Sequence, residues 1–495
     1  MFLIRCNGPW RQCQRSRLRW HSGEASSCRA AVASAAELSR ASAMQRLVGW
    51  VRSHGGFVSE KLEMASLEGR GTACRAMQDL GASEVILRIP GRLDLAHALA
   101  ASTHLLPVAI AHMQQPENLG IRLAMLLALQ LERAAAAPGG GGEDFFEPFW
   151  RTIDPAWSCG RVPCLQAPAD QDLLKGASEF HRILQYPTMF DMIARLSSLK
   201  EQHAKKAGSE RPVVTMPHQA NFIMASRFVA THSFNDACGS SRLVPLAINF
   251  NHDVEARSSA HWYWEMGEDV LCVVARRDII AGEEITISYG LRSNAQLFAL
   301  YGFTLPPIDE PVFTLLAASV AEFLPHEVES KDLNMRVHLT TLPLGASEES
   351  AVVLQQELSA AVAFTRHLQE FLRRAIPMGR SAEQSLELLV TTLSERYMRD
   401  PVIAEFVEGL RQERLRSPRS CAWWAEMDLP VGSWRSDVVR MKMSEYLCLV
   451  TYREALELRS GGRRAAEALP QAVALLPLID AIVGSAAMPC QPGSA

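Results

Sequence analysis

The sequence predicts an α+β protein in which two strand-rich regions flank a helical stretch and an all-α region follows. Two segments predict strands. Glu84–Pro90 is a β-branched run closed by proline, and Glu284–Ser288 is an alternating run that ends at Tyr289-Gly290. Apolar residues at three- and four-residue spacing predict helices between about residues 93 and 242, and again beyond Pro306-Pro307.

Length and charge limit the classes of function. A chain of 495 residues predicts two or three domains. The net charge of −4 provides no basic field, so we expect no nucleic-acid partner. The apolar stretches Leu123–Leu129 and Gln471–Met488 are too short or too interrupted to predict a membrane span. We therefore expect a monomer that binds neither nucleic acid nor membrane.

The cysteines are scattered and form no Cys-x-x-Cys pair. Cys159 and Cys164 are the closest pair, and no histidine lies near them. A disulfide framework is not expected in so long a chain, which favours a reducing compartment. We predict no metal site.

Residues 1–43 differ from the rest of the chain in composition. They contain repeated arginines but no lysine, and only Glu24 and Glu37 as acids, among many serines and alanines. This composition suits either an organelle transit peptide or a disordered tail. A transit peptide would direct the protein to a chloroplast or mitochondrion; otherwise we expect the cytoplasm or nucleus.

A first domain is expected over residues 44–305. It should begin with a helix, because Leu47, Trp50 and Val51 at helical spacing precede the glycine stop at Gly55-Gly56. The alanine-, proline- and glycine-rich tract 134–142 predicts a flexible surface loop inside the helical stretch.

A helical second domain is expected over residues 311–485. Its helices are predicted from four segments with helical periodicity, Glu349–Arg374, Ala382–Arg399, Ile403–Arg416 and Val438–Arg459.

Three motifs lie close together between residues 243 and 305. Val244–His252 ends in Asn-His, Ala281–Gly290 is a strand ending in Tyr-Gly, and Arg292–Phe303 contains Arg-Ser-Asn-Ala and Tyr-Gly-Phe. Together they resemble the closing half of a SET domain, of the subclass typified by the plant Rubisco large-subunit lysine methyltransferase. The resemblance covers roughly residues 44–303.

The resemblance implies a β-rich SET fold with a helical insert at about 93–242, followed by a helical substrate-binding domain. It also implies S-adenosylmethionine (SAM) as cofactor and methyl transfer to a protein side chain. Methyl transfer from a sulfonium is an in-line displacement that requires a held nucleophile and excluded water, but no metal.

Tyr289 is the leading catalytic candidate. In similar proteins this strand-end tyrosine places its hydroxyl beside the transferring methyl group and orients it with the incoming nitrogen. The following Gly290 permits a sharp exit from the strand.

The resemblance assigns cofactor binding to three places in the chain. Asn251 would bond the amino acid moiety of SAM through its amide, and the backbone at His252 would read the adenine edge. The turn formed by Glu68, Gly69 and Arg70 would supply backbone contacts. Arg227 would bind the SAM carboxylate through its guanidinium, with a solvated helix arginine as the alternative.

Substrate contacts are implied for three residues. Tyr263 and Tyr301 match aromatic positions that wall the lysine channel in the Rubisco-methylating members, where ring faces attract a methylammonium. Ala247 leaves room for a lysine stem where a histidine-methylating branch carries tryptophan. Trp262 and Trp264 alternate with Tyr263, so we expect them on the opposite face of a strand, as core packing.

Two residues depart from the family pattern. Ile248 stands where an aspartate is usual, and Thr231 stands where an arginine is expected. In the Rubisco-methylating members both positions help to hold the substrate. Their replacement therefore argues against a Rubisco-type substrate more than it argues against catalysis.

The sequence therefore predicts SAM-dependent N-methylation of lysine on a non-histone protein, which would dock on the C-terminal helical domain. Two alternatives stay open. One is a catalytically impaired SET fold that binds a partner, and the other is a protein-histidine N-methyltransferase.

Overall fold

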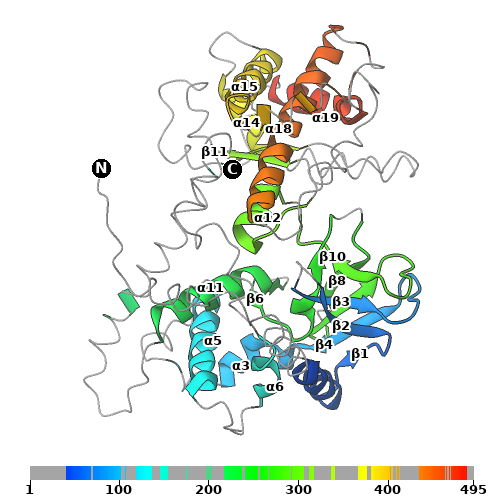
Figure 1. Cartoon of the computed structure of the whole chain (residues 1–495), viewed down its shortest axis with the longest axis vertical. Coiled ribbons are helices and arrows are strands. Elements are labelled where there is room, and N and C mark those ends of the chain that lie inside the picture. The colour runs from blue at the N-terminus through cyan, green and yellow to red at the C-terminus, as the bar shows by residue number, and fades with distance from the viewer. Residues whose placement is uncertain are drawn as a thin grey trace, which may run out of the picture.

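The computed structural model describes residues 41–67, 71–101, 106, 119–136, 145–153, 174, 198–199, 201, 217–236, 240–254, 257–265, 267–290, 292–305, 312–316, 336–340, 366–375, 381–401, 403–404, 408–409, 412, 434–462, 464, 468 and 470–487. Figure 1 shows the strands gathered on one side of the lower half, the insert helices on the other side, and the yellow-to-red C-terminal helices above. Of the N-terminal segment 1–43, residues 1–40 lie outside the described residues and 41–43 begin a helix; most of the loop 134–142 also lies outside them.

Two four-stranded sheets form the β part of the lower half. The first has the order β1-β4-β9-β8, with β1 at Phe57–Val58, β4 at Val85–Pro90, β9 at Val270–Ala275 and β8 at Ala260–Glu265. The second has the order β2-β3-β10-β7, with β2 at Leu62–Leu67, β3 at Gly71–Ala76, β10 at Glu284–Ile287 and β7 at Asn251–His252.

Both sheets join strands from the two sides of the helical insert. β4 pairs with β9, and β3 pairs with β10, in antiparallel register. The exception is β7, which pairs with β10 in parallel, with Thr286 opposite Asn251 and Ile287 opposite His252. The two strand-rich regions of the sequence therefore hydrogen-bond to each other.

The predicted opening helix is present. Residues 41–53 are helical, and Gly55 follows with a φ of 80°, the left-handed conformation that glycine adopts without steric cost. The helix buries Leu47 and Val51 in the core beneath the first sheet.

The insert between the strand-rich regions is helical, as the sequence predicts. Its described helices are η1 (Gly91–Leu93), α3 (Leu95–Ala101), α5 (Leu119–Ala136), α6 (Glu147–Trp150) and α11 (Gln219–His232). A short hairpin of β5 (Phe234–Asn235) and β6 (Ser241–Arg242) follows, and then the turn η6 (Ala247–Asn249).

One hydrophobic core joins the insert to the sheets. The apolar stretch Leu123–Leu129 is buried in α5 and packs with α11 and with strand residues such as Ile86 and Ile285. None of the described helices is long and apolar enough to cross a membrane.

The C-terminal part has its own core and is mainly helical. Its helices are α14 (Arg366–Ala375), α15 (Ala382–Tyr397), α18 (Trp434–Arg459) and α19 (Pro470–Ala487). The mixed fold class is as predicted. Three elements were not predicted, namely α19 and the two strands of an antiparallel pair, β11 (Val312–Leu316) and β12 (Arg336–Thr340).

The helix α12 (Asn294–Tyr301) lies between the two parts of the molecule (Figure 1). It begins at a capping box of Ser293 and Gln296 and ends at Gly302 in the left-handed conformation. Phe298 is fully buried and contacts Trp434 of α18, with ring centroids 4.6 Å apart. The Thr304 hydroxyl donates to Asp437 of α18 at 2.8 Å.

We expect Phe298→Ala to destabilise the protein, because it opens a cavity in the cluster that joins α12 to α18. Loss of a buried phenylalanine typically lowers the free energy of unfolding by about 3–5 kcal/mol. Thermal and urea unfolding measure the change, with Met77→Ala as the control because Met77 is exposed. Equal unfolding midpoints for the two variants would contradict the role of this cluster.

Candidate active site

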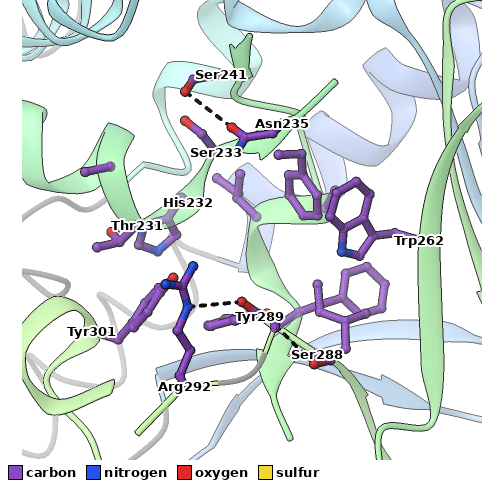
Figure 2. A pocket seen from close by; sticks show the side chains of 17 residues that line it. Thr231, His232, Ser233, Asn235, Ser241, Trp262, Ser288, Tyr289, Arg292 and Tyr301 are labelled. Atoms are coloured by element: carbon purple, nitrogen blue, oxygen red, sulfur yellow. Dashed lines mark hydrogen bonds between the residues drawn. The ribbon is translucent and has the colours of Figure 1, made fainter. Parts of the chain in front are cut away.

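A pocket of about 420 Å³ lies where the insert, the hairpin and the second sheet meet. Its walls come from the end of α11, the β5–β6 hairpin, η6, β8, the end of β10, and α12 (Figure 2). The lining residues are mostly aromatic or carry hydroxyl and amide groups.

Tyr289 is held at the pocket by contacts to the segment around β7. Its hydroxyl donates to the carbonyl of Phe250 at 2.7 Å, and its backbone N–H donates to Nδ1 of His252 at 3.0 Å. The His252 ring stacks on the Tyr289 ring, with centroids 5.0 Å apart. The parallel β7–β10 pairing explains this contact, because it places the segment 250–252 beside the end of β10.

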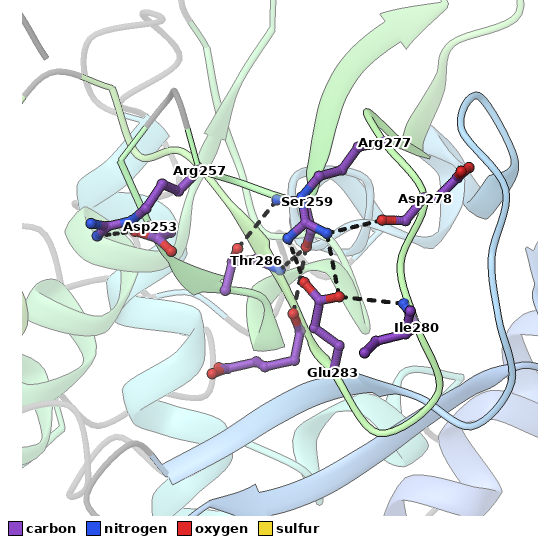
Figure 3. A network of polar contacts seen from close by, with 9 residues as sticks. Asp253, Arg257, Ser259, Arg277, Asp278, Ile280, Glu283 and Thr286 are labelled. Atoms are coloured by element: carbon purple, nitrogen blue, oxygen red, sulfur yellow. Dashed lines mark hydrogen bonds and ion pairs between the residues drawn. The ribbon is translucent and has the colours of Figure 1, made fainter. Parts of the chain in front are cut away.

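A polar network fixes β10 from behind (Figure 3). The Ser259 hydroxyl accepts from the backbone N–H of Thr286 at 2.9 Å, and both residues are buried. In the connection before β10, Arg277 forms an ion pair with Glu283. The strand that ends at Tyr289 is therefore anchored before it reaches the pocket.

Two pairs of aromatic rings wall the pocket. Tyr301 lies beside Tyr289, with ring centroids 4.9 Å apart. Across the pocket, Phe234 meets Trp262 edge to face at 5.1 Å. Burial raises the pKa of Tyr301 and the charge of Arg292 opposes this rise, so the Tyr301 hydroxyl keeps its proton at neutral pH.

Residues 71–290 match the family model of the SET domain. The chain contains a SET domain.

Solved structures of similar fold extend the likeness beyond the SET domain. One is the SET domain of LSMT bound to lysine and AdoHcy, with a TM-score of 0.52 and 16% identity. Others are Rubisco LSMT bound to AdoMet, at 0.52 and 14%, and Rubisco LSMT bound to sinefungin and monomethyllysine, at 0.51 and 14%. Each match covers 88% of this chain and 95% of the other. At this identity the likeness shows the fold. No curated protein matches the sequence.

The placement of Tyr263 in the SET domain corrects the sequence analysis. Tyr263 does not line the pocket. It is 45% exposed on the outer face of β8, opposite Cys272 of β9. Trp262 packs against the hydrophobic core, as expected, and also lines the pocket. Alternation along the strand places the two residues on opposite faces, with Trp262 and not Tyr263 toward the pocket.

Ala247 lines the pocket from a strained turn. Leu246 has a φ of 64° and a ψ of −43°, and the Ala247 N–H donates to the Pro245 carbonyl at 2.7 Å. This is the rare form of γ-turn, which a non-glycine residue adopts only when its surroundings enforce it. The turn also brings Ile248 to the pocket wall. Thr231 lines the same pocket, so the two departures from the family pattern share one site.

Asn251 and His252 lie on β7, the edge strand of the second sheet, and outside the pocket lining. The Asn251 amide donates to Glu284 at 2.8 Å. Glu284 was not predicted as a site residue; it lies at the start of β10, two residues before Thr286, which pairs with Asn251. Glu68, Gly69 and Arg70 lie outside the described residues.

The Arg227 side chain is buried and hydrogen-bonds within the protein. It is only 5% exposed, so the solvated alternative is wrong. Its Nη2 donates to the carbonyls of Ala299 at 2.5 Å and Leu300 at 3.3 Å, near the end of α12. Among the described residues its Nε has no hydrogen-bond partner. A cation at a helix C-terminus satisfies orphan carbonyls and complements the helix dipole, so Arg227 caps the helix that carries Tyr301.

His232 is a pocket residue that sequence analysis missed. Its ring stacks on Phe228 at 4.1 Å, and its Nδ1 lies 2.8 Å from the Thr231 hydroxyl. Burial lowers the pKa of His232 to about 4, so the ring is neutral at pH 7. The only sequence signal for His232 was its position at the C-terminal end of a predicted helix, directly after Thr231.

His232 should make stability depend on pH. Its pKa is about 4 in the folded chain and near 6.5 when exposed, so between these values only the unfolded chain binds the proton. Stability should therefore rise from pH 4 to about 6.5, by up to about 1.4 kcal/mol per pH unit, and then level off. Urea unfolding at several pH values, compared with His232→Gln, isolates this contribution. Parallel stability profiles for the two proteins would exclude it.

We expect Arg227→Met to lower the free energy of unfolding by about 1.5–3 kcal/mol, because charged hydrogen bonds to α12 are lost. Arg227→Lys should recover part of this loss. Thermal unfolding and calorimetric titration with SAM measure the two possible roles separately. Unchanged stability combined with lost SAM binding would return Arg227 to the role of carboxylate ligand.

Proposed function

We propose that this SET-domain protein is a SAM-dependent protein N-methyltransferase that acts on lysine of a non-histone protein. The observation that carries the proposal is the Tyr289 hydroxyl, fixed by the Phe250 carbonyl, in a pocket walled by Tyr301 and Trp262. The similar folds solved with lysine, monomethyllysine and AdoHcy support it.

The residues around β7 fit SAM in part. A carboxamide has two N–H donors and one acceptor, so Asn251 can donate to Glu284 and still accept from an ammonium. Asn251 and Glu284 together therefore suit the amino group of SAM. As the edge strand, β7 has one side of its backbone without a strand partner in its sheet, which suits a planar base edge. Bound SAM would supply an electrophilic methyl group.

Tyr289 would orient the target amine. Because the hydroxyl donates its hydrogen to the Phe250 carbonyl, its oxygen can accept a hydrogen bond from an amine N–H. Accepting that bond would fix the direction of the nitrogen lone pair. Orientation of this kind is a large part of what a displacement reaction needs.

The walls of the pocket would keep the amine neutral. Side chains that replace water raise the free-energy cost of an ammonium and so lower its pKa. Trp262 and Tyr301 are walls of this kind. Among the described residues that line the pocket there is no carboxylate to stabilise the protonated form.

The choice of lysine over histidine rests on the space beside Ala247. Its methyl side chain leaves the pocket floor open to a long, thin alkyl stem. We also propose that the protein substrate docks on the C-terminal helices, because α12 connects Tyr301 to α18.

A second candidate is a SET fold that binds a partner without turnover. Two side chains expected to hold SAM are engaged within the protein, since Asn251 donates to Glu284 and Arg227 donates to α12. This candidate requires that methyl transfer be absent even when a partner is bound.

Incubation with labelled SAM and a cell lysate tests the proposal. We expect a labelled protein whose modified residue is a lysine by mass spectrometry. Labelled histidine would identify the histidine methyltransferase. Binding of a lysate protein without any label, together with no calorimetric SAM binding, would favour the partner-binding module.

We expect Tyr289→Phe to reduce turnover roughly a hundredfold, because the amine loses its hydrogen-bond acceptor. SAM affinity should change little. Tyr263→Phe is the matched control, since it removes the same hydroxyl on the exposed face of β8. Equal turnover by the two variants would reject the role given to Tyr289.

A further inference from the structure

Arg292 is the only permanently charged side chain among the described residues that line the pocket. His232 is neutral at pH 7, and the other lining groups are aromatic, aliphatic, hydroxyl or amide. The pocket therefore presents a single positive charge within an otherwise neutral wall.

The backbone holds Arg292 beside the reaction centre. Its Nε donates to the carbonyl of Tyr289 at 3.3 Å, three residues back along the chain. Figure 2 shows the guanidinium rising between Tyr289 and Tyr301 toward Thr231 and His232. The charge reaches the neighbouring Tyr301, since it opposes the rise that burial causes in the pKa of that hydroxyl.

The wall that faces Arg292 can also receive a polar group. Thr231, Ser233 and Ser241 bring hydroxyls to the pocket, and Asn235 brings an amide. The Ser241 hydroxyl donates to the side-chain oxygen Oδ1 of Asn235 at 3.5 Å, within the β5–β6 hairpin (Figure 2). The three hydroxyls already donate within the protein, to the Arg227 carbonyl, the Val229 carbonyl and the Asn235 side chain, whereas the Asn235 amide N–H can donate to a carboxylate. None of these groups carries a charge that would repel one.

The two departures from the family pattern remove one acid and one base, and they leave Arg292 as the one permanent charge among the described pocket residues. Ile248 lines the pocket where the resemblance expects an aspartate, so an acid that would repel a carboxylate is absent at that position. Thr231 removes the arginine expected on the facing wall. Recognition of a charged neighbour therefore passes to Arg292.

We propose that Arg292 selects target lysines that have an acidic residue close to them in the protein substrate. This inference rests on the proposed lysine methylation. The substrate carboxylate would pair with the guanidinium while the lysine amine reaches Tyr289. Arginine suits this task because its planar fork matches a carboxylate.

A lysine-centred peptide library with degenerate flanking residues and labelled SAM tests the proposal. The wild-type protein should label peptides with Asp or Glu at a fixed flanking position about tenfold better than their Asn or Gln counterparts. Arg292→Gln should remove this ratio, and Arg292→Glu should favour Lys or Arg at the same position. Arg46→Gln is the control, because Arg46 is an exposed arginine of the opening helix that contacts Ser42 and does not line the pocket.

The same comparison on lysate proteins, with methylated lysines mapped by mass spectrometry, covers the case in which peptides are too short to dock. Methylation without acidic enrichment, or enrichment that survives Arg292→Glu, would overturn the proposal and leave the proposed function intact. Absence of both SAM binding and label would instead overturn the proposed function.

Discussion

The parallel pairing of β7 with β10 is the constraint on which the site depends. Without it, the segment 250–252 and the end of β10 would have no reason to meet. The pairing is only two residues long, so other contacts must secure it. Tyr289 does so twice, through its hydroxyl to the Phe250 carbonyl and through its backbone N–H to His252. A structural tie and the proposed catalytic position therefore coincide in one residue.

The helix α12 has a comparable double role. One end carries Tyr301 into the pocket, while Phe298 packs against α18 of the C-terminal part. Arg227 then fastens this helix to the insert. Three regions far apart in the sequence are thus held by one element of two turns. A change in the packing of α18 would therefore move Tyr301 through α12, without a rearrangement of the sheets.

Sequence reasoning predicted those features that local chemistry encodes. Proline-closed and alternating runs gave the strands β4 and β10, and the spacing of apolar residues gave α15 and α18. The motif residues Asn251, His252 and Tyr289 lie close together, because β7 pairs with β10 and the Tyr289 N–H donates to His252.

Features that depend on tertiary contacts were missed. Alternation in β8 separates Trp262 from Tyr263, but only the packing of the sheet decides which of them faces the pocket. The hydrogen bonds of Arg227 could not be predicted, because they depend on where α12 ends, some seventy residues later in the chain. α19 was read only as an apolar stretch, because Pro477 interrupts its pattern.

The bend at Leu246 has a consequence for how ligands would be received. A leucine with positive φ adopts a conformation that an unconstrained chain rarely visits, so the surrounding core must impose it during folding. The part of the pocket lining formed by Ala247 therefore has its final conformation before a ligand binds. Little ordering entropy remains to be lost on association. The backbone at Ala247 is therefore preorganised, and we expect it to exclude ligands of the wrong shape instead of rearranging around them.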